Sequence, residues 1–133
     1  MENKVQKILL VEDDYRLAME WKNQLINKGF DVDNASNSEE ALLLLENNYD
    51  CFIIDLFNVK HGEFLPNGGI KAIAAIRRYG DSYGKPSTII AITGYYRHGG
   101  DCVLSTGEIV KNLGADYAFE KPIELSKIIA VIE

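Results

Sequence analysis

Polar residues that can take part in chemistry follow short apolar runs at several points of this 133-residue sequence. They are Glu12, Asp13 and Asp14 after the run at 7–11, Asp55 after the run at 51–54, Thr93 at the end of the run at 87–93, and Lys121 after the run at 116–120. Asp55 stands out, because four residues of low polarity precede it and Leu56 and Phe57 follow it. A solvated acid rarely has such neighbours, so the sequence predicts a carboxylate in a buried setting.

A fold that brings these side chains together would create a site for a cation and a phosphoryl group. Carboxylates at close range repel one another and raise each other's pKa, so a positive charge must lie among them. Lys121 supplies one charge, and a divalent cation would supply more. Oxygen ligands without histidine or cysteine favour a hard ion, Mg²⁺ or Mn²⁺. Asp55 would then attack phosphorus and form an aspartyl phosphate, while Lys121 and the Thr93 hydroxyl contact the phosphoryl oxygens.

Apolar runs of strand length alternate with helical periodicity along the chain. The predicted strands are residues 7–11, 30–35, 50–55, 87–93 and 116–120, and the predicted helices are residues 15–29, 36–48, 68–80, 105–114 and 122–133. Ser36 and Glu39 have the spacing of a capping box. Pro122 fits the first position of the last helix.

Helices between strands require parallel pairing with right-handed crossovers. The sequence therefore predicts an α/β fold, a flavodoxin-like doubly wound (βα)5 unit with a five-stranded parallel sheet in order 2-1-3-4-5. Residues 30–35 alternate apolar and polar side chains, which places this strand at an edge. The carboxyl ends of the strands line one rim, so the acids after the first and third strands are expected to converge there.

The composition predicts a single soluble domain over residues 1–133. The net charge of -6 argues against a nucleic-acid partner or an anionic membrane surface. No apolar run reaches the length of a membrane span. The two isolated cysteines, Cys51 and Cys102, favour a reduced, cytoplasmic setting. Lys71, Arg77 and Arg78 are interpreted as a solvated helix face.

Four motifs at the strand ends, "ILLVEDD", "CFIIDLFN", "AITG" and "GADYAFEKP", resemble the receiver domain of two-component response regulators, of the chemotaxis-receiver type. The resemblance covers roughly residues 7–132 and implies the following roles. Asp55 matches the phosphoacceptor, Asp13 a direct Mg²⁺ ligand, Glu12 a ligand through water, Phe57 the residue whose backbone carbonyl binds the metal, Thr93 the switch hydroxyl, and Lys121 the lysine before a proline. Asp14 is a helix N-cap in this interpretation and a reserve acid.

The resemblance also implies a function and partners. A sensor histidine kinase or a histidine phosphotransfer protein would transfer a phosphoryl group to Asp55, and the domain would then signal to a downstream protein by contact. The domain would not be an enzyme in the usual sense, although it would catalyse its own phosphorylation and dephosphorylation. A homodimer through the fourth and fifth βα units is a further option.

Three features depart from the family pattern. Asn58 and Val59 replace the methionine-proline pair that usually follows the phosphoacceptor, within a long loop. The loop after Thr93 is also long. Ala118 occupies the position of the aromatic switch residue, with Tyr117 and Phe119 on either side. Either Tyr117 or a loop aromatic, Tyr95 or Tyr96, takes over the switch role, or the output surface works differently.

Three other functions remain open on the sequence. A degenerate receiver that binds proteins constitutively is favoured by Ala118 and opposed by the intact acids. A phosphatase with an aspartyl nucleophile usually needs a second acid two residues later, where Phe57 stands. A flavodoxin-like cofactor binder needs a loop rich in serine, threonine and glycine after the first strand, whereas "EDDYR" would repel a phosphate unless a metal intervened.

Overall fold

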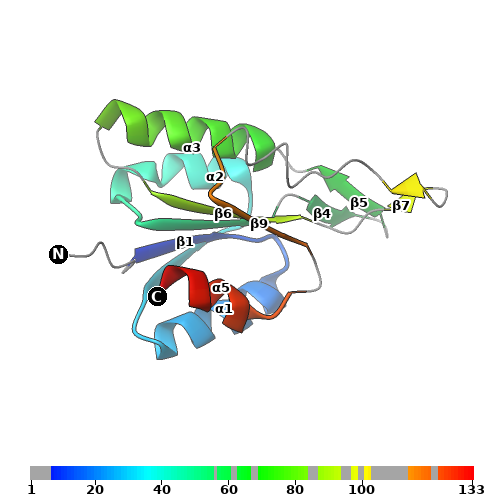
Figure 1. The fold of residues 1–133 in the computed structure, drawn as a ribbon, viewed down its shortest axis with the longest axis horizontal. Helices are drawn as coiled ribbons and strands as arrows, with labels where there is room; N and C mark the ends of the chain where they lie inside the picture. Colours follow the sequence, from blue (N-terminus) through cyan, green and yellow to red (C-terminus); the bar gives the residue numbers. More distant parts are fainter. Residues whose placement is uncertain are drawn as a thin grey trace.

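A computed structural model describes residues 7–55, 57–60, 63–66, 69–83, 87–93, 97–98, 101–102, 114–120 and 123–133. Five parallel strands form the central sheet, in the order β2-β1-β3-β6-β9 (Figure 1). They are β1 (Lys7–Val11), β2 (Asp31–Ala35), β3 (Cys51–Asp55), β6 (Thr88–Thr93) and β9 (Tyr117–Glu120). This confirms the predicted α/β class, the strand order and the edge position of the second strand.

Helices cover both faces of this sheet. In the described residues, the helices are α1 (Tyr15–Asn27), α2 (Ser38–Leu43), the 3-10 turn η1 (Leu45–Asn47), α3 (Gly69–Tyr83) and α5 (Leu125–Ile132). Figure 1 shows α1 and α5 on one face and α2 and α3 on the other. All five residues of β3 are buried, because a central strand is covered on both sides. Its alternate side chains therefore belong to two core clusters, one on each face.

Two of the helices begin at other residues than the sequence predicted, because other residues cap them. The capping box at Ser36 and Glu39 is wrong, because Asn37 caps α2 and its side chain accepts a bond from the backbone N–H of Glu40. The last helix begins at Leu125, so Pro122 does not occupy its first position. Gly29 has a φ of 100° just after α1, a backbone conformation in which glycine carries no steric penalty. The helix predicted at 105–114 lies, except for Gly114, outside the described residues.

Two short antiparallel hairpins are present where the sequence indicated only long loops. The first pairs β4 (Phe57–Lys60) with β5 (Glu63–Pro66), and the second pairs β7 (Arg97–His98) with β8 (Asp101–Cys102). Figure 1 shows β4, β5 and β7 beyond the carboxyl ends of the central strands. The hairpins therefore extend the side of the fold on which β3 and β6 end. In the part of the chain that the structure describes, no helix is long and apolar enough to cross a membrane.

Candidate metal and phosphoacceptor site

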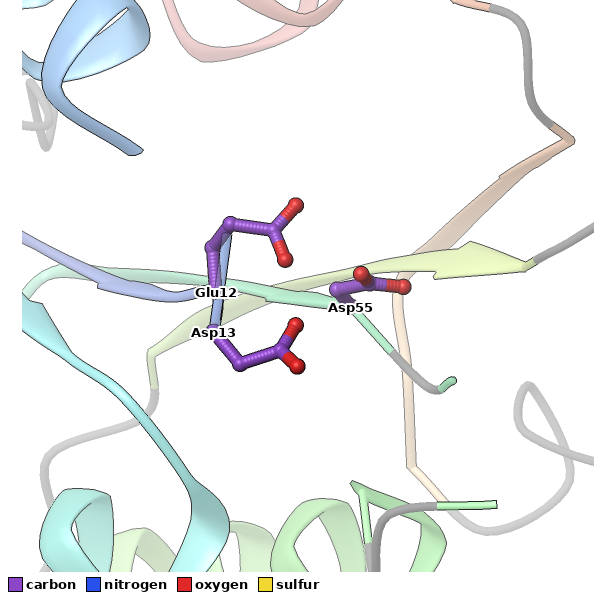
Figure 2. Close-up of side chains that lie close together, drawn as sticks. All are labelled: Glu12, Asp13 and Asp55. Carbon is purple, nitrogen blue, oxygen red and sulfur yellow. The ribbon is translucent and has the colours of Figure 1, made fainter. Parts of the chain in front are cut away.

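The register of the sheet brings three acids together at its rim. Val11 on β1 pairs with Ile54 on β3, and each of these residues is followed directly by an acid. Carboxylate oxygens of Glu12, Asp13 and Asp55 all lie within 4.8 Å of one another. Figure 2 shows the three carboxylates pointing into the same region. The convergence predicted from the strand ends is thus present in the structure.

Two of the three acids are nearly inaccessible to solvent. Glu12 is 7% exposed and Asp55 is 4% exposed, whereas Asp13 is exposed. Burying two carboxylates side by side is costly, because each loses hydration and repels the other. The burial of Asp55 agrees with the setting that its apolar neighbours in the sequence predicted. A cation bound between these groups would offset both costs.

The backbone around the acids is fixed by a helix cap and by the neighbouring strand. The Glu12 N–H donates to the Ala35 carbonyl at 3.0 Å, and the Asp14 N–H donates to Glu12 Oε2 at 3.4 Å. Asp14 Oδ1 in turn accepts bonds from the N–H groups of Arg16 and Leu17, at 3.0 and 3.2 Å. Asp14 is therefore the N-cap of α1, and it is not a member of the three-acid group.

The donor set of this group fits a hard divalent cation. All the side-chain donors are carboxylate oxygens, which Mg²⁺, Mn²⁺ and Ca²⁺ prefer. Because these oxygens all lie within 4.8 Å of one another, Glu12, Asp13 and Asp55 could all contribute ligands to one cation. The three acids thus form a group that could hold a divalent metal ion.

The structure describes the backbone of two of the other predicted site residues, Thr93 and Phe57. Asp55 pairs with Ile92, so Thr93 stands one residue further along the neighbouring strand β6. Thr93 pairs with Glu120 of β9. Lys121 follows Glu120 in the sequence but lies outside the described residues. Phe57 is the first residue of β4 and pairs with Pro66.

The strand alternation of β9 separates Ala118 from its aromatic neighbours. Ala118 pairs with Ala91 and packs against the core cluster beneath α2 and α3. Phe119 packs against the opposite cluster, beneath α1 and α5, and stacks on Tyr117 with ring centroids 6.4 Å apart. Tyr117 therefore lies on the opposite face of the sheet from Ala118, and its part in the switch stays a prediction, while Tyr95 and Tyr96 lie outside the described residues.

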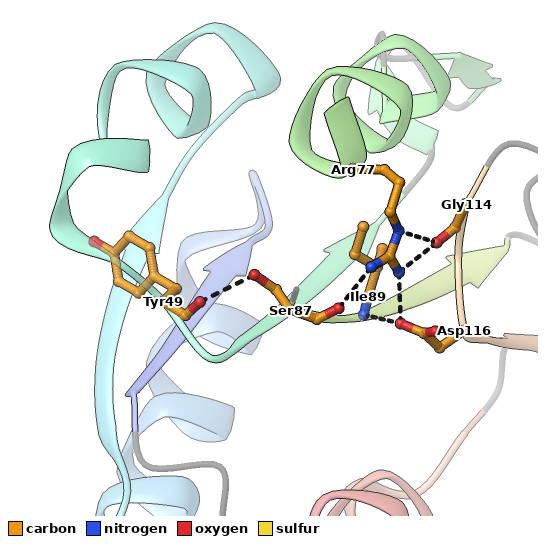
Figure 3. Close-up of polar contacts among 6 residues, drawn as sticks. All are labelled: Tyr49, Arg77, Ser87, Ile89, Gly114 and Asp116. Atoms are coloured by element: carbon orange, nitrogen blue, oxygen red, sulfur yellow. Dashed lines mark hydrogen bonds and ion pairs between the residues drawn. The ribbon is translucent and has the colours of Figure 1, made fainter. Parts of the chain in front are cut away.

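One residue that sequence reasoning treated as solvated has a structural role. Arg77 donates to the carbonyl oxygens of Gly114 and Ser87, and forms an ion pair with Asp116 at 2.7 Å (Figure 3). Asp116 also accepts a bond from the Ile89 N–H at 2.8 Å. The solvated-face interpretation is thus wrong for Arg77, which ties α3 to the starts of β6 and β9. Neither helical periodicity nor composition carries a signal for such a long-range contact.

The environment of Cys51 is that of a core residue. Burial raises the pKa of its thiol well above the usual range, so the thiol stays protonated at neutral pH. The side chain is fully buried, as its apolar neighbours in the sequence indicated. A buried neutral thiol is a poor nucleophile and a poor metal ligand, so Cys51 takes no part in the rim chemistry.

Comparison with known proteins identifies the family. Residues 8–133 match the response regulator receiver domain. A 51-residue stretch is 41% identical to the transcriptional regulatory protein SrrA of Staphylococcus aureus, covering 38% of this chain and 21% of that protein, so the match spans about a fifth of that relative. A CheY-like receiver domain protein from Methanospirillum hungatei JF-1 has a similar structure, with 22% identity, 97% and 91% of the two chains covered and a TM-score of 0.76. A Burkholderia pseudomallei response regulator, solved with a phosphorylated aspartic acid and a calcium ion, has 23% identity, 96% and 66% coverage and a TM-score of 0.71. The chain therefore belongs to the response regulator receiver domain family of two-component systems.

Proposed function

We propose that this domain accepts a phosphoryl group on Asp55 in a reaction that depends on Mg²⁺ or Mn²⁺. The observation that carries the proposal is the buried Asp55 carboxylate within 4.8 Å of the Glu12 and Asp13 oxygens. The donor is a phosphohistidine on a sensor histidine kinase or on a histidine phosphotransfer protein. The phosphorylated domain signals to a downstream protein by contact, in the cytoplasm, and a homodimer through the fourth and fifth βα units is one form of that contact.

The transfer itself is a displacement at phosphorus. An Asp55 carboxylate oxygen forms a bond to phosphorus, the bond from phosphorus to the donor imidazole nitrogen breaks, and the imidazole keeps the electron pair. The bound cation supplies positive charge for the phosphoryl oxygens. Asp13 and Asp55 would hold it directly and Glu12 through a water, while Thr93 and Lys121 would contact the phosphoryl group.

The pairing of the first hairpin supports a role for the Phe57 carbonyl. Pairs that exchange hydrogen bonds alternate with pairs that do not in an antiparallel ladder. Lys60 and Glu63 flank a two-residue connection and form an exchanging pair. Three pairs further along, Phe57 and Pro66 are then a non-exchanging pair, a position that proline tolerates because it lacks an N–H. The Phe57 carbonyl is consequently directed away from β5, which leaves it available as a ligand of the cation.

A relative supports the same chemistry. The Burkholderia pseudomallei response regulator carries a phosphorylated aspartic acid together with a calcium ion. The present chain offers carboxylates that suit both functions, an acid to be phosphorylated and ligands for a divalent cation. The alternative function, a receiver that binds its partner without phosphorylation, is favoured by Ala118, since the family's switch aromatic is missing there. The two functions differ in whether Asp55 reacts.

Binding of beryllofluoride, which stands in for a phosphoryl group on a carboxylate oxygen, tests the proposal. We expect isothermal titration calorimetry to show beryllofluoride binding to the wild-type chain only when Mg²⁺ is present. Asp55→Asn should abolish it. Asp14→Asn is the matched control, because it removes a neighbouring charge while asparagine still caps α1, and it should bind like the wild type. Equal binding by Asp55→Asn, or none by the wild type, would favour the constitutive module.

A further inference from the structure

Asn34 makes two hydrogen bonds at the point where the acid-bearing segment leaves the sheet. Its side-chain Nδ2 donates to the Leu10 carbonyl at 2.9 Å and to the Ala35 carbonyl at 3.3 Å. Both partners are acceptors only, so the amide nitrogen must face them and the amide oxygen must point away. The side chain is half-buried, which shields these bonds from competing water.

These bonds reach the metal-site acids through one shared carbonyl. The Ala35 oxygen accepts both the Asn34 amide and the Glu12 N–H, the latter at 3.0 Å. Leu10, the other acceptor, stands two residues before Glu12 on β1. Asn34 therefore joins the last part of β2 to the last part of β1, the strand that leads directly into Glu12 and Asp13.

The position of β2 makes such a link consequential. The strand lies at the edge of the sheet and ends at Ala35, and strand ends at an edge are the parts of a sheet that open most readily. Asparagine is disfavoured in strands because its side chain competes for backbone bonds. At position 34 the side-chain bonds to the backbone are favourable, since they stabilise the end of the pairing between β1 and β2.

We infer that Asn34 is a positioning residue for the cation site. Its amide holds the Ala35 carbonyl, the carbonyl holds the Glu12 backbone, and the Glu12 and Asp13 carboxylates are thereby kept in reach of Asp55 and a shared cation. The inference rests on the proposed function, because it assumes that the acid cluster binds a divalent cation. Groups that orient metal ligands from outside the coordination sphere typically change metal affinity by about 10- to 100-fold.

The test compares Mg²⁺ affinity with folding stability in three variants of the 133-residue chain. Asn34→Val removes both donors while adding a residue with high strand propensity, so its fold should be preserved. We expect its dissociation constant for Mg²⁺, measured by calorimetry, to rise about tenfold. Val32→Ala is the matched control on the same strand: it shortens a buried side chain of the core cluster beneath α1 and α5, so it should lower the unfolding midpoint and leave Mg²⁺ affinity unchanged. Asn34→Ala serves in the same comparison if Asn34→Val fails to fold.

Each outcome decides between the claims. Weaker Mg²⁺ binding by Asn34→Val, with Val32→Ala unaffected, supports the positioning role. Wild-type affinity in a folded Asn34→Val, or an equal loss of affinity in Val32→Ala, would show that Asn34 serves stability alone. If the wild-type chain binds no Mg²⁺, the proposed function fails together with the inference, whereas Mg²⁺ binding without beryllofluoride binding would overturn the phosphoacceptor role and leave the Asn34 comparison valid.

Discussion

Replacing Asp55 by asparagine removes one of the two buried carboxylates and leaves the shape of the site nearly unchanged. The ligand oxygens of the three acids lie within 4.8 Å of one another, and two unit charges at that distance repel by about 3.5 kcal/mol at an effective dielectric constant of about 20. Solvent around the exposed Asp13 and dissolved salt reduce this repulsion. We therefore expect Asp55→Asn to raise the free energy of unfolding by about 1–3 kcal/mol in metal-free buffer.

Urea unfolding followed by circular dichroism measures this difference. The experiment is run at low ionic strength with a chelator, and repeated with saturating Mg²⁺. Mg²⁺ should stabilise the wild-type chain, since a ligand that binds the folded state shifts the equilibrium toward it. The variant has lost a ligand, so its advantage should shrink or reverse.

Asp14→Asn is again the matched control, because it changes the net charge equally at a residue outside the acid cluster. Its free energy of unfolding should stay within about 0.5 kcal/mol of the wild type. The reasoning is refuted if Asp55→Asn is no more stable than the wild type in the presence of chelator. Such a result would mean that the acid cluster carries no excess repulsion for a cation to relieve.

Three further predictions concern the scaffold. Arg77→Ala should lower the free energy of unfolding, measured in urea, by about 2 kcal/mol, because it removes an ion pair and leaves carbonyl oxygens without their charged donor. Arg78 lies at an exposed position of the same helix, so Arg78→Ala should change this free energy little. Asn37→Ala should lower the free energy of unfolding by about 1 kcal/mol, because α2 loses its N-cap. If Ser36→Ala lowers the melting temperature more than Asn37→Ala does, the assignment of Asn37 as the cap is contradicted. Burial raises the pKa of the Cys51 thiol in the folded chain, so above about pH 8.5 the thiol ionises more readily in the unfolded chain. The contribution of Cys51 to the free energy of unfolding is therefore complete below about pH 8.5 and falls above it by up to about 1.4 kcal/mol per pH unit. Urea unfolding at a series of pH values should show this fall in the wild type and a smaller one in Cys51→Ala.

The sheet could be predicted because a strand that is covered on both faces must be made of apolar residues, and a continuous apolar run is easy to recognise in the sequence. Residues 8–11 of β1 and residues 51–54 of β3 are apolar without interruption, as strands covered on both faces require. The strand order then follows from the helices between the strands. The acid cluster was predictable for the same reason, since fixing the order of β1 and β3 fixes which residues meet at the rim.

The remaining features depend on contacts that local patterns do not encode. Both Ser36 and Asn37 are good capping residues, and only the backbone geometry decides that Asn37 Oδ1 reaches the Glu40 N–H. Arg77 has the spacing of a surface residue, and its partners are separated from it by as many as 39 positions. The two hairpins are too short to show a period, although Gly62 between β4 and β5 is a residue that tight connections favour.

The asparagine at position 34 gave a signal that could have been read. It stands within a strand between Asp33 and Ala35, where residues with higher strand propensity are common. Its amide bonds to Leu10 and Ala35 explain the exception. A polar residue that contradicts local propensity next to a candidate site is thus a useful indicator of a positioning role.

The most direct test of the central claim is intact-protein mass spectrometry after incubation with acetyl phosphate and Mg²⁺. The account predicts a mass increase of one phosphoryl group in the wild type and in Asp14→Asn, its loss when Mg²⁺ is chelated, and its absence in Asp55→Asn. A wild-type chain that gains no phosphoryl group, or an Asp55→Asn chain that gains one equally, would contradict the assignment of Asp55 as the phosphoacceptor.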